Sequence, residues 1–92
     1  MGDSTRIRVV YSGNVQGVGF RATARSLAKG LPVKGFVKNL QDGSVELLAE
    51  GDSTDLDSLL ERIRSRLSAH IRDAQIERGV AKGEFKDFSV RL

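Results

Sequence analysis

The sequence contains no cysteine, and that absence excludes several kinds of site at once. A chain without cysteine has no disulfide, no thiolate metal ligand and no cysteine nucleophile. The only histidine, His70, has no cluster of other ligand residues around it in the sequence, so the pattern does not favour a metal site. We expect His70 to be structural, at the end of a helix, and the protein to need no metal and no other cofactor.

Long apolar stretches are also missing. No run approaches the roughly 20 apolar residues that a membrane-spanning helix needs. Residues 1–6 match neither a signal peptide nor the myristoylation pattern. These features predict a cytoplasmic protein without a membrane partner. A length of 92 residues predicts one domain over residues 1–92, and we expect a monomer.

Acidic residues are absent from positions 4–41, where seven basic residues lie. Residues 1–41, with one acidic residue, therefore carry a net charge of +6, whereas residues 42–92, with eight basic and eleven acidic residues, carry −3. A basic half favours an anionic partner, either a phosphorylated small molecule or nucleic acid. A solvated basic surface explains the same charge, so composition alone leaves both interpretations open.

The pattern of apolar residues predicts five strands and two helices. Alternation at positions 7, 9 and 11 indicates a strand, and a helix is expected over residues 21–29. Apolar residues at helical spacing from 56 to 67 predict a second helix, with Ser53 or Thr54 as its cap. Further strands are expected over residues 34–40, 44–50, 71–78 and 86–92, with Asp42 and Gly43 as a hairpin turn.

This order predicts an α+β fold of the ferredoxin-like type. Its βαββαβ sandwich has an antiparallel sheet, both helices on one face and a short extra C-terminal strand. The fold does not determine the function, because it occurs in enzymes, RNA-binding proteins and regulatory modules. The candidate site therefore has to be identified from individual residues.

A loop with three glycines connects the first strand to the first helix, at positions 13, 17 and 19. Amide groups in such a loop can bind an anion, although a glycine-rich loop can also be a plain connector. Arg21 at the start of the helix opposes the helix dipole, and Arg25 adds like-charge repulsion. A bound phosphate would relieve this strain, and so would a distant acidic residue. Asn39, just before the hairpin turn, is either a turn residue or a second functional residue.

Two segments resemble the signatures of the acylphosphatase family. Residues 12–21 read SGNVQGVGFR, which is similar to the family's S/G-G-x-V-Q-G-V-x-F-R element. Residues 35–45 read GFVKNLQDGSV, which is similar to G-W/Y-V-x-N-x-x-D-G-x-V. The chain departs from the family at Phe36, where Trp or Tyr is frequent, and at Pro32, where Gly is usual. Neither position is catalytic in the family.

The resemblance implies an enzyme that hydrolyses acyl phosphates, with inorganic phosphate as product and inhibitor. Arg21 would grip the phosphate and Asn39 would position the attacking water. The phosphate would be cradled by the backbone amides of Gln16, Gly17, Val18, Gly19, Phe20 and Arg21.

The chemistry of these motifs agrees with such a substrate. They offer no cysteine, histidine or carboxylate as nucleophile or general acid. An acyl phosphate needs none, because its leaving group is a carboxylate with a conjugate-acid pKa of about 4. The alternative is a small RNA-binding or regulatory module of the same fold. Nucleic acid is not the favoured partner, because residues 34–40 lack the further aromatics that stack on bases.

Overall fold

The computed structural model describes residues 4–92, and in this range five strands form one sheet that carries two helices. Residues 1–3 lie outside the described range. They belong to the segment 1–6 that was predicted to contain no signal peptide. The elements are β1 (Thr5–Gly13), α1 (Phe20–Ala28), β2 (Lys34–Asn39), β3 (Val45–Gly51), α2 (Ser53–Leu67), β4 (Ile71–Val80) and β5 (Phe88–Arg91). The strands lie in the order β4-β1-β3-β2-β5. The predicted βαββαβ order with an additional C-terminal strand is confirmed.

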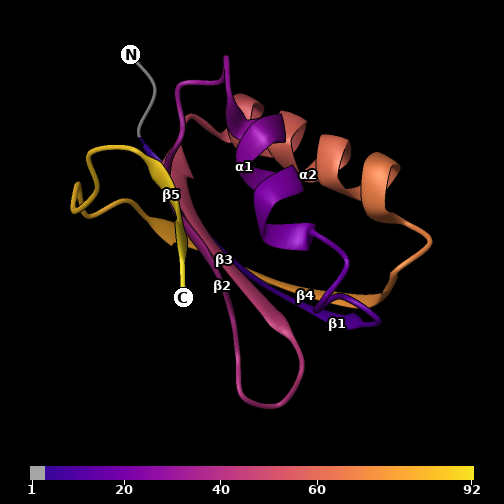
Figure 1. Ribbon diagram of the computed structural model, residues 1–92. Coiled ribbons are helices and arrows are strands. Elements are labelled where there is room, and N and C mark those ends of the chain that lie inside the picture. Colours follow the sequence, from indigo (N-terminus) through magenta and orange to yellow (C-terminus); the bar gives the residue numbers. More distant parts are fainter. Residues whose placement is uncertain (1–3) are drawn as a thin grey trace.

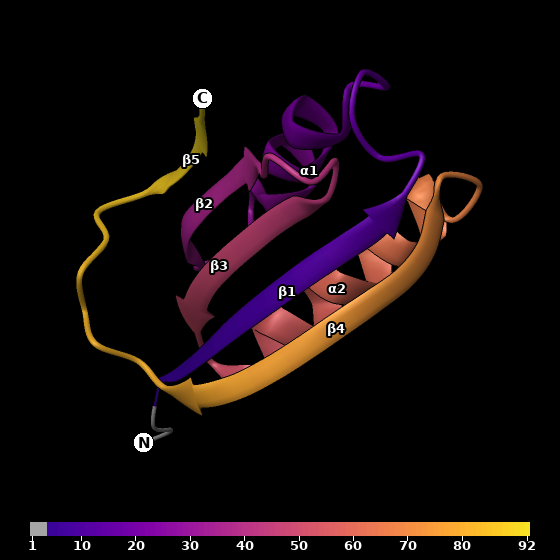
Figure 2. The same cartoon turned by 90° about the horizontal axis from the view of Figure 1, so that it is seen from below.

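Both helices cover one face of the sheet, and the opposite face is open (Figures 1 and 2). The strict alternation of β1 follows from this arrangement, because Ile7, Val9 and Tyr11 all point into the layer between sheet and helices. The helices contribute their apolar stripes to the same core, as predicted from their spacing. Its fully buried larger side chains are Phe20, Ile7, Leu47, Leu56, Leu59, Ile63, Val9, Val15, Val37 and Val45.

β5 differs from the rest of the sheet, because it pairs parallel with β2 whereas the other pairs are antiparallel. The reason is the route of the chain. β4 ends opposite the first residue of β1, at the end of the sheet where β2 begins. Residues 81–87 pass along that end, so β5 starts beside Gly35, near the start of β2 (Figure 2). The sheet is therefore mixed, with one parallel edge strand.

Two local predictions are wrong. Ser53 and Thr54 belong to α2 itself, and the residue before it, Asp52, makes no side-chain capping bond. β5 is shorter than residues 86–92, and Leu92 is fully exposed. In this strand only Phe88 and Val90 pack against the core. The alternation of apolar residues at this end of the chain therefore predicted a strand that is longer than the one observed.

Ion pairs on the open face join the basic first half to the acidic second half. Arg8 Nε lies 2.6 Å from a carboxylate oxygen of Glu46, Lys38 Nζ lies 3.9 Å from the other, and Arg6 lies 3.7 Å from Glu50. Much of the basic charge predicted to attract an anion is therefore compensated within the molecule. None of the helices in residues 4–92 combines the length and apolar character needed to cross a bilayer.

Candidate active site

A pocket of about 210 Å³ opens where the glycine loop, α1, β2 and β5 meet. It brings together Arg21 and Asn39, which are far apart in the sequence. Gly17, Gly19 and Phe20 also line it, whereas Gln16 and Val18 do not. The complete lining is Val15, Gly17, Gly19, Phe20, Arg21, Ala22, Asn39 and Val90. The residues singled out by the sequence thus converge on one small concave surface.

The conformation of the loop explains two of its glycines. Gly17 and Gly19 both have φ of 78°, in the left-handed region that other residues rarely adopt. A Cβ atom at either position would meet nothing within 4 Å, so the requirement is conformational and not steric. Gly19 is also the residue that precedes α1, where it takes the place of a capping side chain.

The loop and the start of α1 present amide groups with few partners in the protein. Residues 16–19 form turns, but within residues 4–92 no amide from Gln16 to Arg21 makes a short, well-aligned backbone bond outside the helices and strands. The first amide bonded into α1 is that of Thr23, to the Gly19 carbonyl at 2.9 Å. The first turn holds no acidic residue and no capping side chain. Free donors at the positive end of a helix dipole are a recurrent anion-binding arrangement.

Arg21 has a neutral partner in place of an acidic one. Its Nη1 donates to the main-chain carbonyl of Arg91 at 2.9 Å. No carboxylate in the described part of the chain lies within 4.0 Å of it. The alternative of a distant acidic partner therefore finds no support in residues 4–92, and the positive charge of Arg21 stays uncompensated while its position is held.

Asn39 is the last residue of β2 and lies on the same side of the sheet as the buried Val37. The predicted turn at Asp42 and Gly43 is present. Asp42 Oδ1 accepts hydrogen bonds from the hydroxyl of Ser44 at 2.5 Å and from its amide at 3.0 Å. These two bonds, the hydroxyl first, lower the pKa of the Asp42 carboxyl. A turn held in this way gives Asn39 a defined place at the edge of the pocket.

The side chain of Gln16 connects the glycine loop to this hairpin. Its Nε2 donates to the carbonyls of Leu40 and Ser44, both at 2.8 Å. The sequence argument considered only the backbone of Gln16, so this role was missed. The residue type gave no signal, because glutamine in a loop is compatible with many partners.

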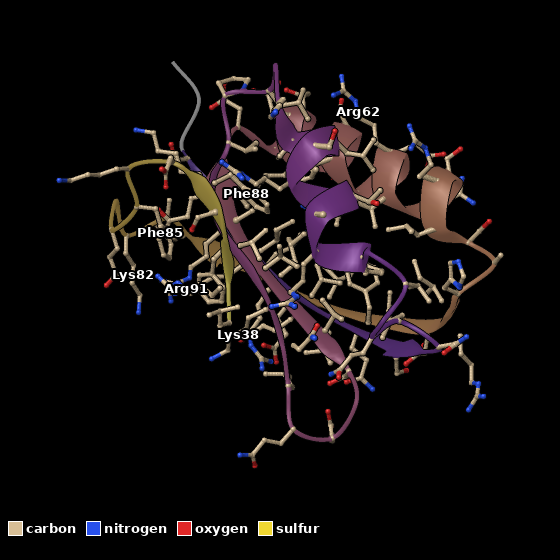
Figure 3. All side chains as sticks on the ribbon, in the orientation of Figure 1. Lys38, Arg62, Lys82, Phe85, Phe88 and Arg91 are labelled. Atoms are coloured by element: carbon tan, nitrogen blue, oxygen red, sulfur yellow. The ribbon has the colours of Figure 1, made fainter. Side chains whose placement is uncertain are left out.

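β5 contributes to the pocket in a way that sequence reasoning also missed. Val90 lines the pocket, beside Val37 of β2, and Arg91 supplies the carbonyl for Arg21. The guanidinium of Arg91 lies over the Phe36 ring on the β2–β5 edge, 3.9 Å from its centre. It also lies near Phe85 (Figure 3). This contact secures the strand whose carbonyl orients Arg21.

The lining residues restrict the chemistry that is possible in the pocket. They include no carboxylate, imidazole, thiol or hydroxyl, so they offer neither a nucleophile nor a general acid or base. Among residues 4–92, no group of three or more His, Cys, Asp or Glu side chains is arranged to hold a metal ion. The pocket can bind an anion and orient a small polar molecule, and a reaction there depends on the reactivity of its substrate.

Comparison with known proteins points to one family. The acylphosphatase family model matches residues 7–90. An acylphosphatase of Anaeromyxobacter sp. (strain Fw109-5) is 39% identical over 92 residues, which is 99% of both chains. The crystal structure of an acylphosphatase from Bacillus subtilis superposes with a TM-score of 0.85 at 30% identity, over 96% of this chain and 99% of that one. The chain also matches 12% of full-length HypF in its phosphate- and nucleotide-bound form, with a TM-score of 0.86 and 25% identity.

Proposed function

The chain belongs to the acylphosphatase family, and we propose that its Arg21–Asn39 pocket is where it hydrolyses acyl phosphates. The reaction cleaves the anhydride bond between a carboxyl and a phosphoryl group, and it yields a carboxylate and inorganic phosphate. The observation that carries the proposal is the convergence of Gly17, Gly19, Arg21 and Asn39 on one pocket. A family match over residues 7–90 argues against the alternative of an RNA-binding or regulatory module.

The phosphoryl group is held by Arg21 and by the free amides of the loop. The planar guanidinium can donate to two phosphate oxygens, and the Arg91 carbonyl holds it in place without neutralising it. Each charge-assisted hydrogen bond contributes about 1.5–3 kcal/mol. The amides that take part are those of Gln16, Gly17, Val18, Gly19, Phe20 and Arg21, none of which makes a short backbone bond outside the helices and strands of residues 4–92.

Asn39 positions the attacking water. Its side-chain amide offers both donors and an acceptor, so it can bind a water molecule without removing a proton from it. The water oxygen attacks phosphorus in line with the departing carboxylate, and the electron pair of the broken P–O bond leaves on that carboxylate. The proton of the water passes to a phosphate oxygen of the substrate, because the pocket lining contains no base.

This division of tasks explains why an acyl phosphate is the substrate class. Its leaving group has a conjugate-acid pKa of about 4 and departs without protonation. Catalysis then needs only orientation and stabilisation of charge on the phosphoryl oxygens, as in other phosphoryl transfers. Ala22 leaves space beside Arg21, which favours an open pocket with little selection of the acyl part.

Replacing Arg21 tests phosphate binding. We expect Arg21→Ala to lower kcat/KM for acetyl phosphate by about 10³-fold or more, by analogy with arginines that stabilise phosphoryl transfer. Inhibition by inorganic phosphate should weaken in parallel. Arg25→Ala is the matched control, because Arg25 lies exposed on the same helix outside the pocket. Near-normal turnover by Arg21→Ala would rule out the proposed role.

Replacing Asn39 tests the orientation of water. We expect Asn39→Ala to lower kcat by about 10²-fold, as for loss of a positioned donor, with little change in KM. Gln41→Ala removes an exposed amide two positions further along the hairpin and should leave kcat unchanged. A rise in KM at constant kcat would instead make Asn39 a binding residue.

Two broader expectations remain predictions. We propose that the enzyme works as a monomer, since Arg21 and Asn39 already come together in one pocket of a single chain. A cytoplasmic location likewise remains a proposal. Sedimentation of the active enzyme would test the first, and fractionation of the source cells would test the second.

A further inference from the structure

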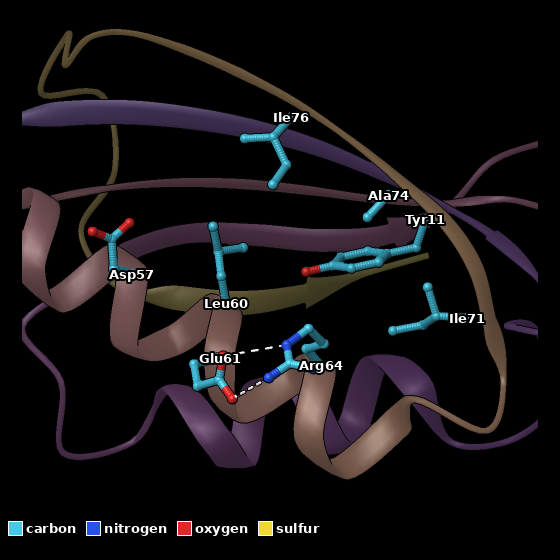
Figure 4. A pocket seen from close by; sticks show the side chains of 8 residues that line it. All are labelled: Tyr11, Asp57, Leu60, Glu61, Arg64, Ile71, Ala74 and Ile76. Carbon is cyan, nitrogen blue, oxygen red and sulfur yellow. Dashed lines mark hydrogen bonds and ion pairs between the residues drawn. The ribbon is translucent and has the colours of Figure 1, made fainter.

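A second pocket lies between α2 and β4, apart from the residues assigned to catalysis. It has a volume of about 180 Å³, and its interior is apolar (Figure 4). Leu60 of α2 faces Ile76 and Ala74 of the edge strand across it. The full lining is Tyr11, Asp57, Leu60, Glu61, Arg64, Ile71, Ala74 and Ile76.

Tyr11 places a hydroxyl group in this pocket. Only 3% of the residue is exposed, and the hydroxyl points into the pocket on the side of Leu60 (Figure 4). Within residues 4–92 it makes no hydrogen bond. The oxygen itself is not sealed from solvent, because within residues 4–92 no side-chain oxygen or nitrogen is both fully buried and unpaired, so water reaches the hydroxyl through the pocket. A ligand with an acceptor atom would take the place of that water.

The hydroxyl acts as a donor at any ordinary pH. Burial raises the pKa of Tyr11 well above its usual range, so the phenol stays protonated. A protonated phenol can also accept a bond, but the hydrogen that it offers has no acceptor among residues 4–92, so the ligand we infer carries an oxygen or nitrogen lone pair. This requirement distinguishes the pocket from a purely apolar hole.

The charged residues at the rim do not favour an ion. Asp57 accepts from Arg78 at 2.8 Å, and Glu61 is bonded twice to Arg64, at 2.6 and 3.2 Å. Each charge that lines the pocket thus has an opposite charge beside it. A net-neutral rim around an apolar interior fits a neutral molecule better than an anion or a cation.

The volume limits the size of that molecule. An apolar cavity of roughly 150 Å³ in another protein binds benzene. A pocket of about 180 Å³ has room for one ring and one or two further atoms. We propose that the α2–β4 pocket binds a small neutral molecule, a single aromatic ring or a short apolar chain. One acceptor atom of this molecule accepts a hydrogen bond from the Tyr11 hydroxyl.

The two pockets are neighbours but distinct. The rings of Tyr11 and Phe20 pack with their centres 5.0 Å apart, and Phe20 lines the Arg21–Asn39 pocket. This ring pair separates the two pockets and leaves no lining residue in common. The inference therefore does not depend on the proposed catalytic residues.

Benzyl alcohol and toluene test the inference as probes with and without an acceptor. In NMR titrations of the full chain, benzyl alcohol should show NOEs to the methyl groups of Leu60 and Ile76. Tyr11→Phe should lower the affinity for benzyl alcohol about five- to tenfold, which is the effect of one hydrogen bond, and leave the affinity for toluene unchanged. Absence of these NOEs, or an equal effect of Tyr11→Phe on both probes, would overturn the proposal.

A second variant keeps the test decisive if Tyr11→Phe folds poorly. Ala74→Leu fills the pocket from the exposed edge strand and should abolish binding of both probes. Ala69→Leu, in the turn between α2 and β4 and outside the lining, is its control and should bind as the unmodified protein does. Undiminished binding by Ala74→Leu would place the probes elsewhere and refute the assignment.

Discussion

Gln16 shows how much of the site depends on one uncharged side chain. Two hydrogen bonds from its amide nitrogen join the glycine loop to the carbonyls on either side of the hairpin turn. The loop carries the proposed phosphate site, and the hairpin carries Asn39 one residue before Leu40. The side chain thus fixes the position of the proposed phosphate site relative to Asn39.

We therefore expect Gln16→Leu to reduce both stability and turnover. Each carbonyl keeps one backbone donor, from Leu40 or from Gly43, so the loss of unfolding free energy should be about 1–2 kcal/mol. The value of kcat should fall because Asn39 loses its fixed distance from the loop. Urea unfolding and steady-state kinetics measure the two effects. Gln75→Leu, on the exposed edge strand, is the control. Unchanged kcat would show that the hairpin holds Asn39 without Gln16.

At this scale the sequence predicted residues whose chemical type suits their role. Arg21 conflicted with the helix dipole, which indicated a ligand, and Asn39 stood at a turn within a family signature. The carbonyl of Arg91 could not be predicted, because every residue has one and only the fold brings this one to Arg21. The side chain of Gln16 was missed for a similar reason, since its partners are backbone atoms.

Among the elements, the segment between β4 and β5 is held at its middle by one buried carboxylate. The carboxylate of Glu50, on β3, accepts from the amides of Lys82 and Gly83 at 2.8 and 3.0 Å. Glu50 is itself only 7% exposed, and Arg6 lies beside it. The anchor holds residues 81–87 against the end of the sheet, which is what places β5 next to β2.

Removing this anchor should loosen the segment. We expect Glu50→Ala to lower the unfolding free energy by about 1–3 kcal/mol, because it removes the acceptor of two amides and one of the two carboxylates that pair with Arg6. Trypsin should then cleave faster after Lys82 and Lys86. Glu84→Ala loses only an exposed ion pair with Arg6 and should behave as the unmodified protein. Equal cleavage of the two variants would contradict the anchoring role.

The sequence predicted the elements well where periodicity is strong and less well where tertiary contacts decide. The spacing in α2 and the alternation in β1 follow directly from burial on one side. The parallel direction of β5 depends on the route of residues 81–87, which no local pattern encodes. The start of α2 was misjudged because serine and threonine are acceptable both as caps and inside the first turn.

For the whole molecule, we expect phosphate binding to raise the free energy of unfolding. A ligand that binds only the folded state raises the unfolding free energy by RT ln(1 + [L]/Kd), about 1.4 kcal/mol at ten times Kd. Inorganic phosphate should therefore raise Tm of the unmodified protein and of Arg25→Ala. It should leave Tm of Arg21→Ala unchanged. An equal rise in all three proteins would mean that phosphate acts as a general salt.

Arg21 is the only ionisable side chain among the residues that line the Arg21–Asn39 pocket. Arginine keeps its proton throughout the range that cells experience. Acidification of the surroundings therefore leaves the charge of the pocket as it was and changes only the protonation of the incoming phosphoryl oxygens. We therefore expect the acid limb of the rate to follow the titration of the substrate, because no side chain that lines the pocket changes its charge in that range.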